Sequence, residues 1–157
     1  MKKGIALLIC IALLFGCAAA DQVVELPDSR YVINIPDGMV YSKPQKGDDG
    51  VHAYLLSDLL EMDYLSYAVE DTAAPDPLES LKDRAKKLEA AGMDVELRLV
   101  NGIELIVYRI TDETDGTPGI GYVLEDGRMA VEVIFWFATQ EAADLSQSIM
   151  ETIRINE

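Results

Sequence analysis

The stretch DVELRLVNGIELIVYRI (residues 94–110) carries the clearest structural signal in the sequence. Asn101-Gly102 supplies the positive φ angles that a two-residue hairpin turn needs, and a β-rich run lies on each side of it. The stretch therefore predicts an antiparallel hairpin made of Asp94–Val100 and Ile103–Ile110.

A second hairpin is expected directly after the first. The runs Ile120–Leu124 and Arg128–Phe137 flank Asp126-Gly127, which suits the same turn chemistry. Apolar residues alternate on both faces of Arg128–Ala138, so this strand should be central in its sheet.

Shorter β-rich runs occupy the first half of the chain. They are Gln22–Leu26 and Tyr31–Ile35, joined by a turn at Pro27–Arg30, and His52–Ser57 and Asp63–Glu70. The polar segment Lys43–Gly50 is predicted to be a loop.

Two amphipathic helices are expected. Asp76 as N-cap, Pro77 at the first helical position and Gly92 beyond the end mark the first helix. Its apolar stripe consists of Leu78, Leu81, Ala85 and Leu88. The second helix begins after Thr139 as N-cap and places Ala142, Leu145, Ile149 and Ile153 at helical spacing.

This order of elements predicts an α+β fold in a single globular domain over residues 22–157. Consecutive hairpins imply a mainly antiparallel sheet, and the two helices must bury their apolar stripes, most simply against that sheet.

Three segments in this order resemble the PsbP-like superfamily, whose fold is shared with Mog-type Ran-binding proteins: YVINIPDG (31–38), LVNGI (99–103) and IMETIR (149–154). The resemblance implies an α/β/α sandwich around an antiparallel sheet. It brings no catalytic residues, because the superfamily has no shared catalytic site. Met39 departs from the pattern, since such proteins often carry a large aromatic residue after the early Pro-x-Gly turn.

The first 16 residues are expected to form a signal peptide. Lys2 and Lys3 precede the apolar run Ile5–Phe15, which is shorter than the ~20 residues that a membrane-spanning helix needs. Leu14-Phe-Gly-Cys17 resembles the bacterial lipobox, in which a signal peptidase cuts before a diacylglyceryl cysteine. We therefore expect an exported lipoprotein anchored through acylated Cys17, with residues 17–21 as a short tether.

The chain is strongly acidic. Without the leader, eleven basic residues stand against 28 acidic ones, a net charge of −17. Such a field repels nucleic acid and anionic head groups, so we expect no nucleic-acid partner. The expected contacts are the lipid bilayer through Cys17, on the outer face of the cytoplasmic membrane or in the outer membrane, and an envelope protein or glycan.

No recognised catalytic motif occurs in the sequence. His52 is the only histidine, and no nucleophile elbow accompanies it. The glycine-rich segment Gly116–Gly121 leads into a strand, whereas a phosphate loop opens a helix. Cys10 leaves with the leader and Cys17 would be a thioether, so thiol chemistry is not expected, and no cofactor is indicated.

Two alternatives depend on the surplus of carboxylates. The first alternative is a calcium site, because calcium prefers hard oxygen ligands such as carboxylates. Two clusters offer them: Asp112, Glu113 and Asp115, and separately Asp48-Asp49. Neither cluster matches the twelve-residue calcium loop. Paired carboxylates could instead serve an envelope hydrolase, which requires a separation that sequence does not give.

Aromatic residues in the expected strands offer a further binding hypothesis, a groove for a sugar or peptide. They are Tyr54, Tyr64, Tyr67, Tyr108, Tyr122 and Trp136. Together these patterns favour a membrane-tethered, non-enzymatic binding or accessory protein of the cell envelope over a hydrolase or a calcium-responsive module.

Overall fold

The computed structural model describes residues 21–26, 28–37, 39, 45–46, 52–68, 77–127 and 129–156. Its elements are, in chain order, β1 (Gln22–Glu25), β2 (Tyr31–Ile35), β3 (Gln45–Lys46), β4 (His52–Ser57), β5 (Leu60–Ala68), α2 (Pro77–Ala90), β6 (Val95–Val100), β7 (Ile103–Thr111), β8 (Pro118–Asp126), β9 (Met129–Phe137), α3 (Gln140–Met150) and β10 (Arg154–Ile155). The predicted α+β class is confirmed.

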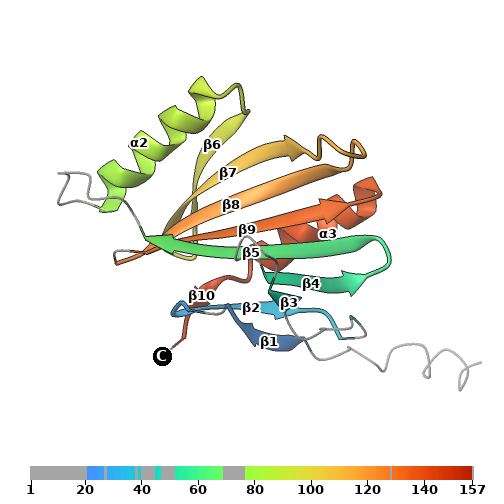
Figure 1. Ribbon diagram of the computed structural model, residues 1–157. Helices are drawn as coiled ribbons and strands as arrows, with labels where there is room; N and C mark the ends of the chain where they lie inside the picture. Colours follow the sequence, from blue (N-terminus) through green and yellow to red (C-terminus); the bar gives the residue numbers. More distant parts are fainter. Residues whose placement is uncertain are drawn as a thin grey trace, which may run out of the picture.

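The strands form two sheets rather than the single sheet that the sequence suggested. The large sheet has the order β3-β4-β5-β9-β8-β7-β6, and the small sheet has the order β1-β2-β10 (Figure 1). All neighbouring strands are antiparallel. The strand β9 lies between β5 and β8, so the prediction of a central strand is confirmed.

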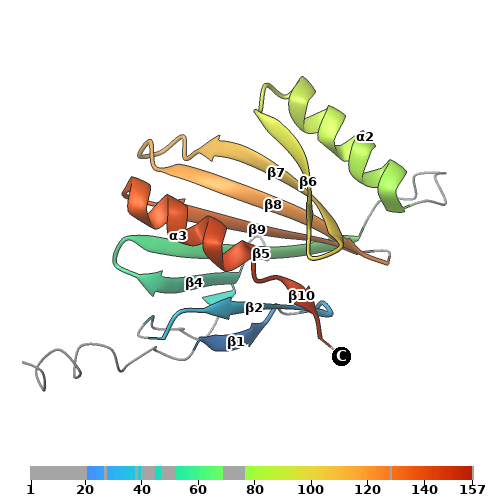
Figure 2. The same cartoon turned by 180° about the vertical axis from the view of Figure 1, so that it is seen from behind.

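The large sheet is covered on both faces. The helix α2 packs on one face, where Leu81 and Ala85 meet Ile106, Tyr108 and Val123. The helix α3 and the small sheet cover the other face, and α3 lies behind the large sheet in Figure 1 and in front of it in Figure 2. This three-layer arrangement is the expected α/β/α sandwich, extended by the small sheet.

Local signals account for both helices. The helix α2 begins at Pro77, and Gly92 follows its end with φ of +88°. At the start of α3, the Thr139 side chain accepts a hydrogen bond from the backbone N–H of Ala142. The expected N-cap Asp76 lies outside the described residues.

The β6–β7 hairpin has the predicted turn, since Asn101 and Gly102 have φ of +51° and +80°. The β8–β9 turn begins one residue later than predicted. Asp126 pairs with Met129 as the last residue of β8, and Gly127 takes the positive φ of +65°. Asp126 remains in the strand beside Arg30, whose guanidinium lies 3.0 Å from its carboxylate.

Several further boundaries differ from the predictions, and β8 begins at Pro118 instead of Ile120. The strand β5 begins at Leu60, so the turn Asp58-Leu59 joins it to β4 as a hairpin. The segment expected to be a loop holds β3, and the rest of Lys43–Gly50 lies outside the described residues. Ile153 was placed on the second helix, but α3 ends at Met150.

The chain after α3 turns to add β10 to the small sheet. The Thr152 hydroxyl donates to the carbonyl of Ile149 and accepts from the backbone N–H of Asn34, at 2.6 and 2.7 Å. These contacts direct Arg154 and Ile155 along β2. Ile153 is fully buried in the core as a result, although it is not helical.

Candidate functional site

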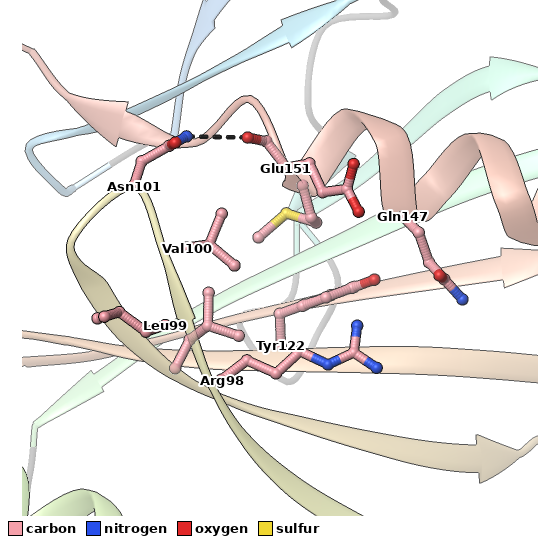
Figure 3. A pocket seen from close by; sticks show the side chains of 9 residues that line it. Arg98, Leu99, Val100, Asn101, Tyr122, Gln147 and Glu151 are labelled. Atoms are coloured by element: carbon pink, nitrogen blue, oxygen red, sulfur yellow. Dashed lines mark hydrogen bonds between the residues drawn. The ribbon is translucent and has the colours of Figure 1, made fainter.

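A pocket of about 410 Å³ opens between the β6–β7 hairpin and the C-terminal end of α3 (Figure 3). This volume is within the range of small-molecule sites, roughly 300 to 1,000 Å³. The pocket is lined by Arg98, Leu99, Val100, Asn101, Leu105, Tyr122, Gln147, Met150 and Glu151. Residues from β6, β7, β8 and α3 thus meet at one place.

Tyr122 is the buried polar residue of this pocket. Its side chain comes from the interior strand β8, is 3% exposed, and packs edge-on against Phe135 with ring centroids 6.0 Å apart. Its hydroxyl has no hydrogen-bond partner among the described residues. Burial raises the pKa of Tyr122 to about 12, so the phenol is neutral and can donate at physiological pH.

Asn101 connects the two walls of the pocket. Its side-chain amide donates to the backbone carbonyls of Glu151 and Ile153, both at 2.9 Å, and Figure 3 shows the first of these bonds. The turn residue of the hairpin is thereby fixed to the end of α3.

Arg98 supplies the positive charge at the opening. Its guanidinium donates to the Glu96 carboxylate at 2.8 Å, and this hydrogen bond holds the pKa of Glu96 below its usual range. In Figure 3 the Tyr122 hydroxyl lies between Arg98 and Gln147. A ligand group entering here would meet a guanidinium and an amide, with the neutral phenol buried beside them, which suits an acceptor such as a carbonyl or a carboxylate.

The pocket continues on both sides. A smaller hollow of about 60 Å³ shares Arg98 and Gln147 with it, and a hollow of about 450 Å³ shares Asn101 and extends to Arg154. Among the described residues, Glu151 is the only carboxylate that lines the central pocket. The arrangement offers hydrogen bonding and one cation but does not place two carboxylates together there.

The tyrosines whose side chains are described do not converge on one cleft, a convergence that would have supported the groove hypothesis. Tyr64 and Tyr108 are buried in the core on opposite faces of the large sheet, and of the aromatic side chains that the structure describes only Tyr122 lines the central pocket. Tyr67 instead accepts a hydrogen bond from Arg84 at 3.0 Å. Only the backbone is described at Tyr54 and His52, in β4.

The glycine-rich segment has a packing role in β8. A Cβ on Gly121 would lie 2.1 Å from Cζ of Tyr108, and a Cβ on Gly119 would lie 2.8 Å from Cε3 of Trp136. The two rings therefore cross β8 directly over these glycines. Tyr108 donates to Glu132 at 2.5 Å and Trp136 donates to Asp63 at 2.7 Å.

The predicted calcium ligands lie in the β7–β8 loop. Asp112 accepts a hydrogen bond from the N–H of Thr114 at 2.6 Å, and Asp115 accepts one from the N–H of Thr117 at 2.8 Å. The contacts with Thr117 lower the pKa of Asp115. Glu113 is exposed, and the described part of the chain holds no group of three residues arranged for a metal. Asp48 and Asp49 lie outside it.

Sequence reasoning named Tyr122 as an aromatic strand residue but missed Arg98 and Gln147. These residues are far apart in the chain and ordinary for their elements, so no local pattern marks them. The predicted lipidation site Cys17 lies outside the described residues. Among the residues that the structure describes, no helix is long and apolar enough to cross a membrane.

No protein-family model and no curated protein sequence matches the chain. Among solved structures, the fold is similar to a protein from Bacteroides thetaiotaomicron VPI-5482, with a TM-score of 0.56 and 12% identity over 82% of this chain. The aligned part covers 46% of that protein, so this chain spans about half its length.

A second similar structure is the cyanobacterial PsbP protein CyanoP from Synechocystis sp. PCC 6803. Its TM-score is 0.55 at 11% identity, covering 90% of this chain and 95% of that one. The fold of this chain is therefore PsbP-like, as the sequence resemblance implied. At such identities the similarity concerns the fold alone.

Proposed function

We propose that this chain is a membrane-tethered, non-enzymatic binding protein of the bacterial cell envelope, and that it binds its ligand in the pocket between the β6–β7 hairpin and α3. The observation that carries the proposal is the Tyr122 hydroxyl, which is buried beside this pocket and has no hydrogen-bond partner among the described residues. An unsatisfied buried polar group costs about 1 to 3 kcal/mol, and a ligand acceptor would offset that cost.

The surroundings of the hydroxyl define the chemistry of the ligand. Arg98 favours an acidic or carbonyl group, whereas Val100 and Met150 offer apolar surface. Such a mixture suits a compact segment of a polypeptide or glycan that carries acceptors. None of the pocket residues makes a nucleophile–base pair, which supports a binding role over a hydrolytic one.

Tethering is supported by the leader sequence. Lys2 and Lys3, the short apolar run and Leu14–Cys17 match the signal of a bacterial lipoprotein. Two acyl chains on Cys17 would provide the two-signal anchoring that stable attachment requires. The short tether would then hold the pocket close to the bilayer.

The ligand proposal is tested by photo-crosslinking in intact cells. A benzoylphenylalanine in place of Gln147, at the pocket, should give a reproducible adduct with an envelope protein or glycan. The matched control carries the same group in place of Glu113, in an exposed loop away from the pocket. Equal labelling at both positions would contradict a ligand site at the pocket.

The tethering proposal has a separate test. Cys17→Ser should abolish incorporation of labelled palmitate and release the chain from the membrane fraction, while Cys10→Ser should leave both unchanged because Cys10 lies within the leader. Membrane retention of the Cys17→Ser chain at the native level would show that the lipid does not hold it.

A further inference from the structure

The strand β6 forms one edge of the large sheet and is a full-length strand of six residues. The opposite edge, β3, has only two residues. Natural sheets protect their long edges with proline, bulges, charged side chains or covering segments. The strand β6 contains no proline and pairs with β7 in an unbroken register from Val95 to Val100, so it carries no bulge over this range.

The register defines which backbone groups face outward. Arg109 donates its N–H to the carbonyl of Asp94, so these two residues form a hydrogen-bonded pair. Such pairs alternate along an antiparallel ladder, and Glu96 and Arg98 therefore also bond to β7. The N–H and C=O groups of Val95, Leu97 and Leu99 then point away from β7, along the free edge.

The side chains of β6 are exposed and self-complementary. Leu97 and Leu99 are 46% and 68% exposed, which is high for leucines in a sheet, and they lie on the same face as α2. Glu96 and Arg98 lie on the other face, where they form an ion pair within one copy at 2.8 Å, and their side chains are still 59% and 40% exposed. One edge thus carries an apolar stripe on one face and one charge of each sign on the other.

We propose that two copies of this chain associate through their β6 edges, antiparallel about a two-fold axis at Leu97. In this register Leu97 lies opposite Leu97 of the second copy, and Val95 lies opposite Leu99. Glu96 then lies opposite Arg98 of the second copy, and the two-fold axis repeats this pair. The two large sheets join into one, and the outward N–H and C=O groups of both edges are satisfied.

The charges of Glu96 and Arg98 favour this register over the neighbouring registers of the two β6 strands. A two-fold axis at Glu96 would place two carboxylates directly opposite each other, and an axis at Arg98 would oppose two guanidinium groups. Like charges directly across a sheet are destabilising, whereas opposite charges stabilise it. A two-fold contact is also closed, so the association stops at a dimer instead of extending into a fibre.

The first experiment reverses the charges of Glu96 and Arg98 in the full chain. The dissociation constant of the dimer is measured in detergent micelles by analytical ultracentrifugation. Arg98→Glu and Glu96→Arg should each weaken the dimer by about tenfold, because each single change creates two like-charge pairs across the interface. The double variant Glu96→Arg/Arg98→Glu should restore the native dissociation constant. A monomeric native chain, unaffected single variants or an unrestored double variant would each overturn the proposal.

The second experiment measures the register directly. Cα atoms of a hydrogen-bonded cross-strand pair lie about 5.5 Å apart, a distance that a disulfide spans. Leu97→Cys in the oxidising cell envelope should therefore give a covalent dimer. Leu59→Cys is the control, because Leu59 is an exposed leucine in the β4–β5 turn. Equal dimer yields from both variants would contradict pairing at Leu97.

Discussion

The hydroxyl of Tyr122 should lower the stability of the free protein and strengthen the binding of the proposed ligand. Tyr122→Phe removes a buried hydroxyl that has no partner in the described part of the chain, and it keeps the ring that packs on Phe135. We expect the free energy of unfolding to rise by about 1 kcal/mol. Urea denaturation at neutral pH measures this change.

The matched control is Tyr31→Phe. The Tyr31 hydroxyl is also buried but donates to the carbonyl of Glu125 at 2.5 Å. Removing it should lower the free energy of unfolding by about 1 kcal/mol, because it leaves that carbonyl unpaired. If both substitutions destabilised the protein equally, the Tyr122 hydroxyl would have a partner within the fold.

Gly121 leaves no room for a side chain under Tyr108. Gly121→Ala should lower the free energy of unfolding by about 2 to 3 kcal/mol, because its Cβ would meet the Tyr108 ring at 2.1 Å. In a Tyr108→Ala background the same substitution should cost little, and a double-mutant cycle measures the difference. An equal cost in both backgrounds would mean that Tyr108 is not the obstacle.

The sequence alone explains the glycine of the hairpin turn, Gly102, but not the need for Gly121. Local chemistry gave the turn at Asn101-Gly102, because positive φ depends on neighbouring residues alone. The need for Gly121 depends on the strand register that brings Tyr108 opposite it. Tyr122 was likewise one aromatic residue among several until the structure showed which of them lines the pocket.

At the scale of elements, Asn101 couples a hairpin to a helix. Asn101→Gly keeps the positive φ but removes both bonds to the end of α3, and we expect it to lower the free energy of unfolding by about 1 to 2 kcal/mol. Asn101→Ala should cost a further ~1 kcal/mol, since alanine disfavours that backbone conformation.

The two Asn101 variants are compared by urea denaturation. Native stability of Asn101→Gly would show that the bonds to Glu151 and Ile153 contribute nothing. In that case the geometry of the pocket would not depend on them.

Most elements were predicted from local pattern. Both helices and the two C-terminal hairpins follow from capping residues, turn residues and apolar periodicity. The strand β10 could not be found in this way, because two residues carry no periodicity and Arg154 and Ile155 are extended only through their pairing with β2. The turn at Gly127 was misplaced by one residue because Asp126 is held in β8 by Arg30, a distant partner.

At the scale of the whole molecule, buried tyrosines should make the fold sensitive to alkali. Burial raises the pKa of both Tyr64 and Tyr122 from the ordinary value of 10 to about 12. The unfolded chain therefore loses these protons first as the pH rises. Stability is fully present below pH 10 and falls between pH 10 and 12, by about 2 to 3 kcal/mol for each tyrosine.

Thermal unfolding measured across this pH range tests the expectation. The melting temperature of the native chain should fall steeply above pH 10, and Tyr122→Phe should reduce the slope. An identical slope in the variant would indicate that Tyr122 titrates normally in the folded state.

The overall architecture was predictable as a class but not in its division into sheets. Apolar alternation predicts which residues are buried, and it led correctly to antiparallel strands with two helices. It does not say which strands pair, so the separation of β1, β2 and β10 from the large sheet was missed. The pocket was missed for the same reason, because its walls come from elements distant in sequence.

The most direct test of the proposed binding role combines the pocket probe with Tyr122→Phe. With benzoylphenylalanine in place of Gln147, the yield of the adduct in intact cells is measured for the native residue and for Tyr122→Phe at equal protein levels. The proposed function predicts that Tyr122→Phe lowers the yield while the variant stays folded and becomes more stable. An unchanged yield from a stably folded variant would contradict a ligand that bonds to Tyr122.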